Sequence, residues 1–167
     1  MPSKKVLITG ATGLLGSNVA AELVERGFQV RALLRKSSNT IAIHDIPCEK
    51  YYGDITNAQS VSEAVEGCDF VIHSAANTSQ WGADMTAHDS VNVLGTQYVI
   101  KAVKTHNIRR FIHVSTANTM RPGSLNEPGS EQNSFSYGDS ATKYIATKHE
   151  AEQLVLDAAN QGVPALI

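Results

Sequence analysis

Short apolar runs alternate with amphipathic segments along almost the whole chain, and this alternation limits the possible folds more than any other feature. The amphipathic segments predict helices. They are "GLLGSNVAAELVERG", "TNAQSVSEAVEG", residues 83–105 and a segment that includes "YIATKHEAEQ". The apolar runs predict six strands, "KKVLITG", "FQVRALLR", "CEKYYGD", "DFVIHSAA", "RRFIHVST" and "VPALI". Strands that alternate with helices predict a doubly wound α/β fold, a parallel sheet with helices on both faces.

Two local features complete the predicted order. Thr56 and Gln59 have the spacing of a capping box, and Gly67 marks the end of the helix that they begin. The last run, "VPALI", begins a sixth strand in which the sequence stops. We therefore expect the 167 residues to be a fragment, or part of a longer chain.

Composition excludes several classes of function. The net charge is -2 and the sequence pI is about 6.3, so no electrostatic footprint for nucleic acid or an anionic membrane is present. The sequence contains no apolar run long enough to span a bilayer, and its first residues lack the pattern of a signal peptide. The two cysteines, Cys48 and Cys68, fit a reducing cytosol, and the six histidines show no metal-ligand spacing. These features predict a cytoplasmic protein with no metal site.

A glycine-rich turn joins the first predicted strand to the first predicted helix. In "TGATGLLG", Gly10 permits a tight turn, Gly13 lets the backbone approach a pyrophosphate, and Gly16 lets the helix and strand pack closely. The N-terminus of the helix then offers N–H groups and the positive end of a dipole to phosphates. The spacing is G-x-x-G-x-x-G, but the strand before it and the helix after it favour dinucleotide binding over an ordinary turn.

The second predicted strand ends in Arg35 and Lys36, where NAD-specific sites carry an acid that binds the ribose 2′-OH. An arginine there can pair with a 2′-phosphate, which favours NADP; the alternative is a solvated surface residue. After the third strand, Asp54 is a candidate for the adenine amino group or, equally, a helix-entry residue.

Tyr144 and Lys148 stand four residues apart on one face of a predicted helix. An ammonium beside a phenol favours phenolate, which makes the tyrosine a usable proton donor and acceptor near neutral pH. Taken alone this spacing is common. However, the segment "HVSTANT" lies at the carboxyl end of the fifth predicted strand, where open α/β sheets bind ligands. It supplies a hydroxyl from Thr116 or Ser115.

The motifs "TGATGLLG", "GDIT", "HSAA", "VNVLGT", "HVST" and "YIATK" together resemble the extended short-chain dehydrogenase/reductases, the NAD(P)-dependent epimerase/dehydratase superfamily. Within it, "VRALLR" and "NTSQW" make the chain most similar to dihydroflavonol-4-reductase-like proteins. The resemblance covers nearly all of the chain. It implies that residues 1–167 form an NAD(P)-binding Rossmann domain with the catalytic residues, and that the smaller substrate domain is largely absent.

The resemblance also implies roles for single residues. Tyr144 would be the acid/base, Lys148 its electrostatic and ribose-binding partner, and Thr116 the family's Ser/Thr hydroxyl. His73 and His113 are expected beside the core and not in catalysis. The implied cofactor site consists of Gly10, Thr12, Gly13, Leu14, Leu15, Gly16, Arg35, Asp54, Ile55, Ser74, Ala75, Ala76, Asn92, Tyr144 and Lys148.

One departure narrows the chemistry. Related sugar-nucleotide dehydratases carry an Asp-Glu pair after the Ser/Thr, whereas Ala117 and Asn118 follow Thr116 here, so dehydration is disfavoured. We therefore expect an NADP-dependent reductase of a small carbonyl compound. The alternatives are an NAD-dependent sugar-nucleotide epimerase and, less favoured, a non-catalytic dinucleotide sensor.

A homodimer is possible by analogy. The loop of residues 121–140 and Trp81 are candidates for the wall of the substrate cleft, or for solvent-exposed and strand-capping roles.

Overall fold

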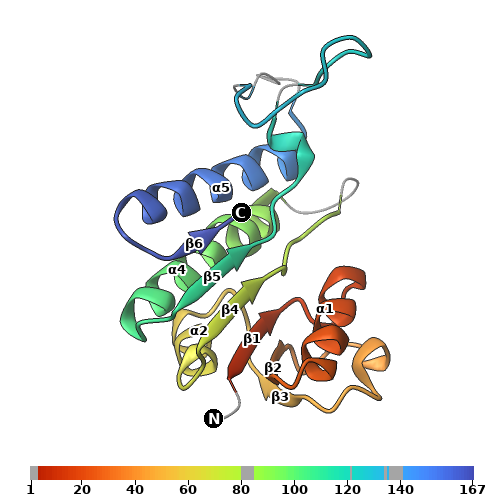
Figure 1. The fold of residues 1–167 in the computed structure, drawn as a ribbon, viewed down its shortest axis with the longest axis vertical. Helices are drawn as coiled ribbons and strands as arrows, with labels where there is room; N and C mark the ends of the chain where they lie inside the picture. Colours follow the sequence, from red (N-terminus) through yellow and green to blue (C-terminus); the bar gives the residue numbers. More distant parts are fainter. Residues whose placement is uncertain (1–3, 80–84, 121, 134, 136–140) are drawn as a thin grey trace.

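A computed structural model describes residues 4–79, 85–120, 122–133, 135 and 141–167 (Figure 1). All six predicted strands are present and form one parallel sheet in the order β3-β2-β1-β4-β5-β6. Their bounds are β1 Lys5–Thr9, β2 Gln29–Leu34, β3 Glu49–Tyr52, β4 Phe70–His73, β5 Arg110–His113 and β6 Ala165–Leu166. The doubly wound fold is confirmed.

Helices cover both faces of this sheet, as Figure 1 shows. One face packs against α1 and a short 3-10 turn, and the other against α2, α4 and α5. The α-helices are α1 Leu14–Glu25, α2 Ala58–Val65, α3 Met85–His88, α4 Gly95–Thr105 and α5 Lys143–Asn160. The 3-10 helices are η1 Ile41–Ile43 and η3 Ala117–Thr119, and η2 Asp89–Leu94 is a π-helix.

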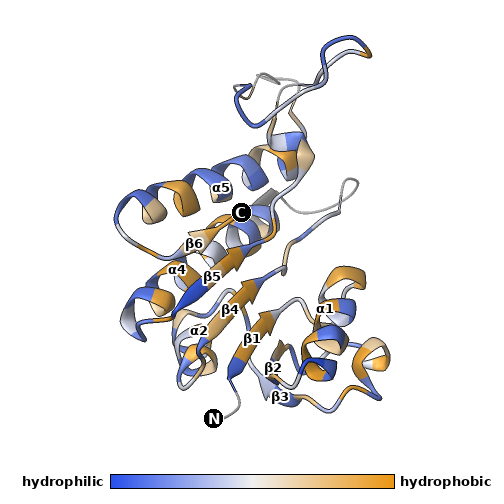
Figure 2. Ribbon diagram, in the orientation of Figure 1, coloured by the Kyte–Doolittle hydropathy of each residue, from blue (hydrophilic) through white to orange (hydrophobic). Residues whose placement is uncertain are grey.

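The side chains of β1 explain why the sheet has two cores. Successive strand residues point to opposite faces. Leu7 therefore belongs to the core under α2, α4 and α5, while Val6 and Ile8 belong to the core under α1. All three are almost completely buried. Figure 2 accordingly shows apolar colour along the central strands and mixed colour on the helices.

The start of α2 differs from the predicted capping box. Asn57, and not Thr56, is the N-cap, and its side chain accepts a hydrogen bond from the Ser60 N–H at 2.9 Å. Thr56 instead donates through its N–H and its hydroxyl to Asp54, both at 2.8 Å. The N-cap lies one residue later than predicted because the Asp54 carboxylate already binds Thr56 in the preceding turn.

The long predicted helix is interrupted. From residue 85 the chain is helical to Thr105, but the segment Asp89–Leu94 has π-helical hydrogen bonding. An inserted π-turn of this kind re-aims side chains and occurs often near functional sites. Here it carries Asn92, one of the residues implied by the resemblance.

Candidate active site

A cleft of about 960 Å³ lies at the carboxyl ends of the central strands. The chain leaves β1 toward β2 on one side and reaches β4 on the other, so the strand order reverses between β1 and β4. Open α/β sheets bind ligands at such a reversal. Every implied cofactor residue except Asn92 lines this cleft.

The glycine turn is built at backbone contact. Gly10 has a φ of +75°, and a Cβ there would lie 2.7 Å from the Ala75 nitrogen. A Cβ on Gly16 would lie 2.2 Å from the Gly10 carbonyl oxygen, so only glycine lets α1 start this close to β1. A Cβ on Gly13 would meet only the Gly10 oxygen, at 3.4 Å, so the backbone at Gly13 is open toward the cleft. The N-cap residue of α1 is Gly13, which has no side chain to cap the helix, so the first N–H groups of α1 can bind an anion.

Polar contacts tie the end of β4 to the end of β1. The Ser74 hydroxyl donates to the Thr9 carbonyl at 2.7 Å, and the Ala75 N–H donates to the Thr9 hydroxyl at 3.2 Å. Both contacts fix the backbone of Ser74 and Ala75 across from the glycine turn. These two hydrogen bonds hold the ends of β1 and β4 together at the floor of the cleft.

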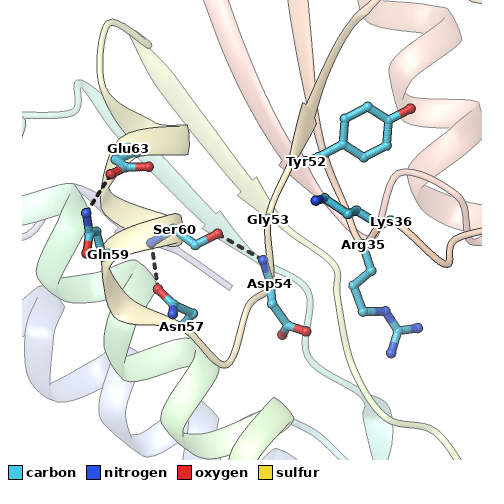
Figure 3. Close-up of a pocket in the computed structure, with 9 residues that line it drawn as sticks. All are labelled: Arg35, Lys36, Tyr52, Gly53, Asp54, Asn57, Gln59, Ser60 and Glu63. Carbon is cyan, nitrogen blue, oxygen red and sulfur yellow. Dashed lines mark hydrogen bonds between the residues drawn. The ribbon is translucent and has the colours of Figure 1, made fainter.

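A smaller pocket of about 380 Å³ opens at the ends of β2 and β3 (Figure 3). It shares Arg35, Gly53 and Asp54 with the cleft, and Lys36 lines it as well. Figure 3 shows the Asp54 side chain beside the start of α2 and the Arg35 guanidinium extending from the end of β2. Asp54 Oδ1 is already taken by Thr56, so the helix-entry role of Asp54 is present, and the residue also faces the cleft.

Lys148 lies at the other end of the cleft and is 4% exposed. Its ammonium donates to the Val114 carbonyl at 2.6 Å, and Nζ lies 3.4 Å from His113 Nε2. Burial lowers the pKa of Lys148 to about 8, and the Glu152 carboxylate acts in the opposite direction. Tyr144, one helical turn earlier on α5, lines the same part of the cleft.

Of the two candidate hydroxyls after β5, Ser115 lines the cleft and Thr116 does not. Ser115 donates its hydroxyl proton to the Glu152 carboxylate in a short hydrogen bond. Thr116 is half-buried and caps η3, where its Oγ1 accepts from the Asn118 N–H at 3.3 Å. The Ser115 proton is thus committed, whereas the bond at Thr116 uses only a lone pair.

His73 and His113 lie directly behind Lys148 and are buried, with ring centroids 5.3 Å apart. This agrees with their expected place in the core. Burial, with a smaller effect of Lys148, lowers the pKa of His73 to about 3. Burial first, then His73 and Lys148, lowers the pKa of His113 to about 2. Both imidazoles are therefore neutral at physiological pH.

The partners of His73 define its tautomer. Thr96 donates its only hydroxyl proton to the Asn92 carbonyl at 2.7 Å, so it must accept from His73 Nε2–H at 3.0 Å. His73 Nδ1 is then bare and accepts from the Thr9 hydroxyl at 2.7 Å. The tautomer is assigned from the donors and acceptors that surround the ring. The hydrogen bonds then all run in one direction, from Thr9 on β1 through His73 on β4 to Thr96 and on to the Asn92 carbonyl in η2.

Asn92 lies behind the cleft, 2% exposed, and its side chain is fully engaged. Its Oδ1 accepts from the Asn77 N–H at 2.7 Å. Its Nδ2 donates to the Asn77 carbonyl at 3.1 Å and to the Thr147 hydroxyl at 3.0 Å. Asn92 therefore fastens the segment after β4 to the helix that carries Tyr144 and Lys148.

Several residues of the cleft were not predicted. They are Thr9, Leu33, Ser38, Gly53, Thr56, Asn77, Thr78, Ser79, Ala87, Val91 and Val114. Most of them lie inside the motifs quoted above, and only Ser38 and Ala87 lie outside them, so taking each motif as a whole finds nearly all of these residues. Trp81 lies outside the described residues, and none of the described residues of the 121–140 loop lines the cleft.

No group of three or more histidine, cysteine, aspartate or glutamate side chains among the residues that the structure describes is arranged to hold a metal ion. Over the same residues, no helix combines the length and apolar character that a membrane span requires.

Comparison with known proteins decides the family. Residues 6–167 match the sequence profile of the NAD dependent epimerase/dehydratase family. The chain belongs to this family. It is 36% identical, over 98% of its length, to a 2-alkyl-3-oxoalkanoate reductase of Stenotrophomonas maltophilia, of which it covers 48%. It is 31% identical, over 96% of its length, to a Synechocystis protein named for dihydroflavonol 4-reductase, of which it covers 46%.

A solved structure supports the same assignment. A short-chain dehydrogenase/reductase superfamily protein from Agrobacterium tumefaciens, crystallised with NAD, superposes with a TM-score of 0.82 at 29% identity. The match covers 98% of this chain and 48% of that protein. The chain spans about half the length of the curated relatives it matches. The expected resemblance is confirmed, including its likeness to a protein named for dihydroflavonol reduction.

Proposed function

We propose that this protein is an NADP-dependent oxidoreductase that reduces the carbonyl group of a small compound to an alcohol. The observation that carries the proposal is a buried Lys148 beside Tyr144 at one end of a cleft whose other end is the glycine turn. A relative with 36% identity is named as a reductase of 3-oxoalkanoates, which are ketones. This favours a ketone over a sugar nucleotide.

The glycine turn fits a dinucleotide. Side chains are excluded at Gly10 and Gly16 by backbone contact, and Gly13 is open, so a pyrophosphate can approach the uncapped N-terminus of α1. The cleft continues from there past Ser74 and Ala75 to Tyr144. The bound cofactor would supply the hydride.

The protein's own residues would handle the proton. The Tyr144 phenol donates a proton to the carbonyl oxygen as that oxygen gains negative charge, and Lys148 stabilises the phenolate that remains. A hydroxyl donor orients the oxygen. Two hydroxyls that follow β5 are candidates for this role: Ser115 lines the cleft but gives its proton to Glu152, and Thr116, the residue implied by the resemblance, has an uncommitted proton but lies outside the cleft lining.

Arg35 supports the preference for NADP. It directly follows β2, borders both the cleft and the small pocket, and lies next to Lys36. A guanidinium at this position can pair with a 2′-phosphate through two parallel hydrogen bonds. Arg35→Gln should weaken NADPH binding about tenfold and leave NADH binding nearly unchanged. Arg110→Gln, at an exposed position on β5, is the matched control.

The reaction is tested with the full-length protein, NADPH or NADH, and a panel of ketones that includes 3-oxoalkanoates. Consumption of NADPH with a ketone, and NADP-dependent oxidation of the product alcohol, are expected. NAD that co-purifies with the protein, together with no consumption of added NADPH, would contradict the proposal. That result would instead favour an epimerase, since the family includes such enzymes.

A further inference from the structure

Among the residues that the structure describes, Glu152 is the acid whose carboxylate raises the pKa of Lys148, against the larger lowering effect of burial. It stands one helical turn after Lys148 on α5 and is half-buried. Its carboxylate accepts the short hydrogen bond from Ser115, which lines the cleft beside Tyr144 and Lys148. Glu152 thus connects α5 to the segment after β5, through its contact with the cleft-lining Ser115.

The surroundings of Lys148 make a nearby negative charge important. Its ammonium contacts the backbone carbonyl of Val114 and the neutral imidazole of His113, and His73 lies behind His113. No ion pair to Lys148 occurs among the described residues. A buried ammonium without a countercharge tends to lose its proton. Glu152 is the group that opposes this loss.

The same carboxylate sets the direction of the Ser115 hydroxyl. A serine hydroxyl has a single proton, and here it points to Glu152, so only oxygen lone pairs are left toward the cleft. Ser115 can therefore accept a hydrogen bond from a ligand but cannot donate one. At this end of the cleft, donation to a substrate oxygen is then left to Tyr144.

We propose that Glu152 is a positioning residue for the reaction: its carboxylate orients the Ser115 hydroxyl and keeps Lys148 protonated below the cleft. The proposal rests on the proposed function, because it gives Lys148 its role beside Tyr144. It assigns Glu152 no contact with substrate. The titratable groups that face Lys148 are Glu152 and Tyr144 on α5, His113 on β5 and His73 on β4.

The test compares Glu152→Gln with Glu150→Gln in the full-length protein. Glu150 is exposed on the same helix, so its variant makes the same change of charge away from the site. Two readouts are taken, the NMR titration of ¹³C-labelled lysine, with Lys148 assigned by Lys148→Met, and the pH profile of kcat. In Glu152→Gln both the Lys148 titration and the alkaline limb of kcat should move down by about one pH unit. Glu150→Gln should match the wild type in both.

An unchanged Lys148 titration in Glu152→Gln would overturn the proposal. If Glu152→Gln does not fold, Glu152→Asp is measured instead. Since this variant retains the negative charge, its Lys148 should titrate close to the pH found in the wild type, and a shift of the Lys148 titration by about one pH unit would count against the proposal. The NMR readout needs no turnover. A wild type that consumes no NADPH therefore contradicts the proposed function, while an unshifted Lys148 in an active enzyme contradicts only the role of Glu152.

Discussion

Acidification should destabilise this protein through its two buried histidines. His73 and His113 are neutral in the folded state, with pKa values of about 3 and about 2. In the unfolded chain each imidazole has a pKa of about 6.5 and binds a proton as the pH falls. The unfolded state then holds more protons than the folded state, so stability falls as the pH drops below about 6.5 and continues to fall toward the folded pKa values.

Between pH 7 and pH 5, the unfolding free energy lost through the two histidines depends only on how many protons they bind in the unfolded state. Down to pH 5 both folded-state imidazoles stay neutral. Between pH 7 and pH 5 each histidine then costs about 2 kcal/mol of unfolding free energy, and the pair about 4 kcal/mol. This is a large fraction of the roughly 5–15 kcal/mol that stabilises a typical domain.

The assay is urea unfolding of the wild type, His73→Gln and His44→Gln at pH 7 and pH 5. Glutamine can accept from Thr9 and donate to Thr96, as His73 does, but it does not titrate. His73→Gln should lose about 2 kcal/mol less than the wild type between the two pH values. His44 is exposed, so His44→Gln should lose as much as the wild type. Equal losses for all three proteins would refute the account of His73.

Two further predictions concern packing around the cleft. Gly16→Ala places a Cβ 2.2 Å from the Gly10 carbonyl oxygen, so α1 must shift. It should cost about 1–3 kcal/mol of stability and weaken NADPH binding, measured by urea unfolding and fluorescence titration. Asn92→Ala removes three hydrogen bonds and leaves the part-buried N–H and carbonyl of Asn77 without these partners, so it should cost about 2–3 kcal/mol and lower the melting temperature measured by circular dichroism. A melting temperature of Asn92→Ala equal to that of the wild type would contradict the fastening role.

The sequence was sufficient for the strands and most of the cleft because both depend on local patterns. A short run of strand-forming residues identifies each strand, and parallel strands bring their carboxyl ends to one edge. The resemblance to the family assigned Gly10, Ser74 and Tyr144 to one site although they lie far apart in the chain, and all three line the cleft. The turn was predicted from the glycine spacing, and the positive φ of Gly10 agrees with it.

The parts that the sequence did not reveal depend on contacts between distant segments. The π-helical segment η2 has no residue pattern that distinguishes it from an α-helix in the sequence. The position of Asn92 behind the cleft could therefore not be predicted from residue spacing. The bond between Ser115 and Glu152 joins the segment after β5 to α5, and no local pattern signals it. The cap of α2 was misplaced from Asn57 to Thr56 because the Asp54 carboxylate competes for Thr56.

The most direct test of the central claim is a comparison of Tyr144→Phe with the wild type. It measures NADPH-dependent ketone turnover and NADPH affinity on the same two proteins. Loss of the phenol hydroxyl should lower turnover by at least about 100-fold, while the dissociation constant for NADPH stays within about twofold of the wild type. Turnover by Tyr144→Phe at the wild-type rate would contradict the claim that this phenol transfers the proton.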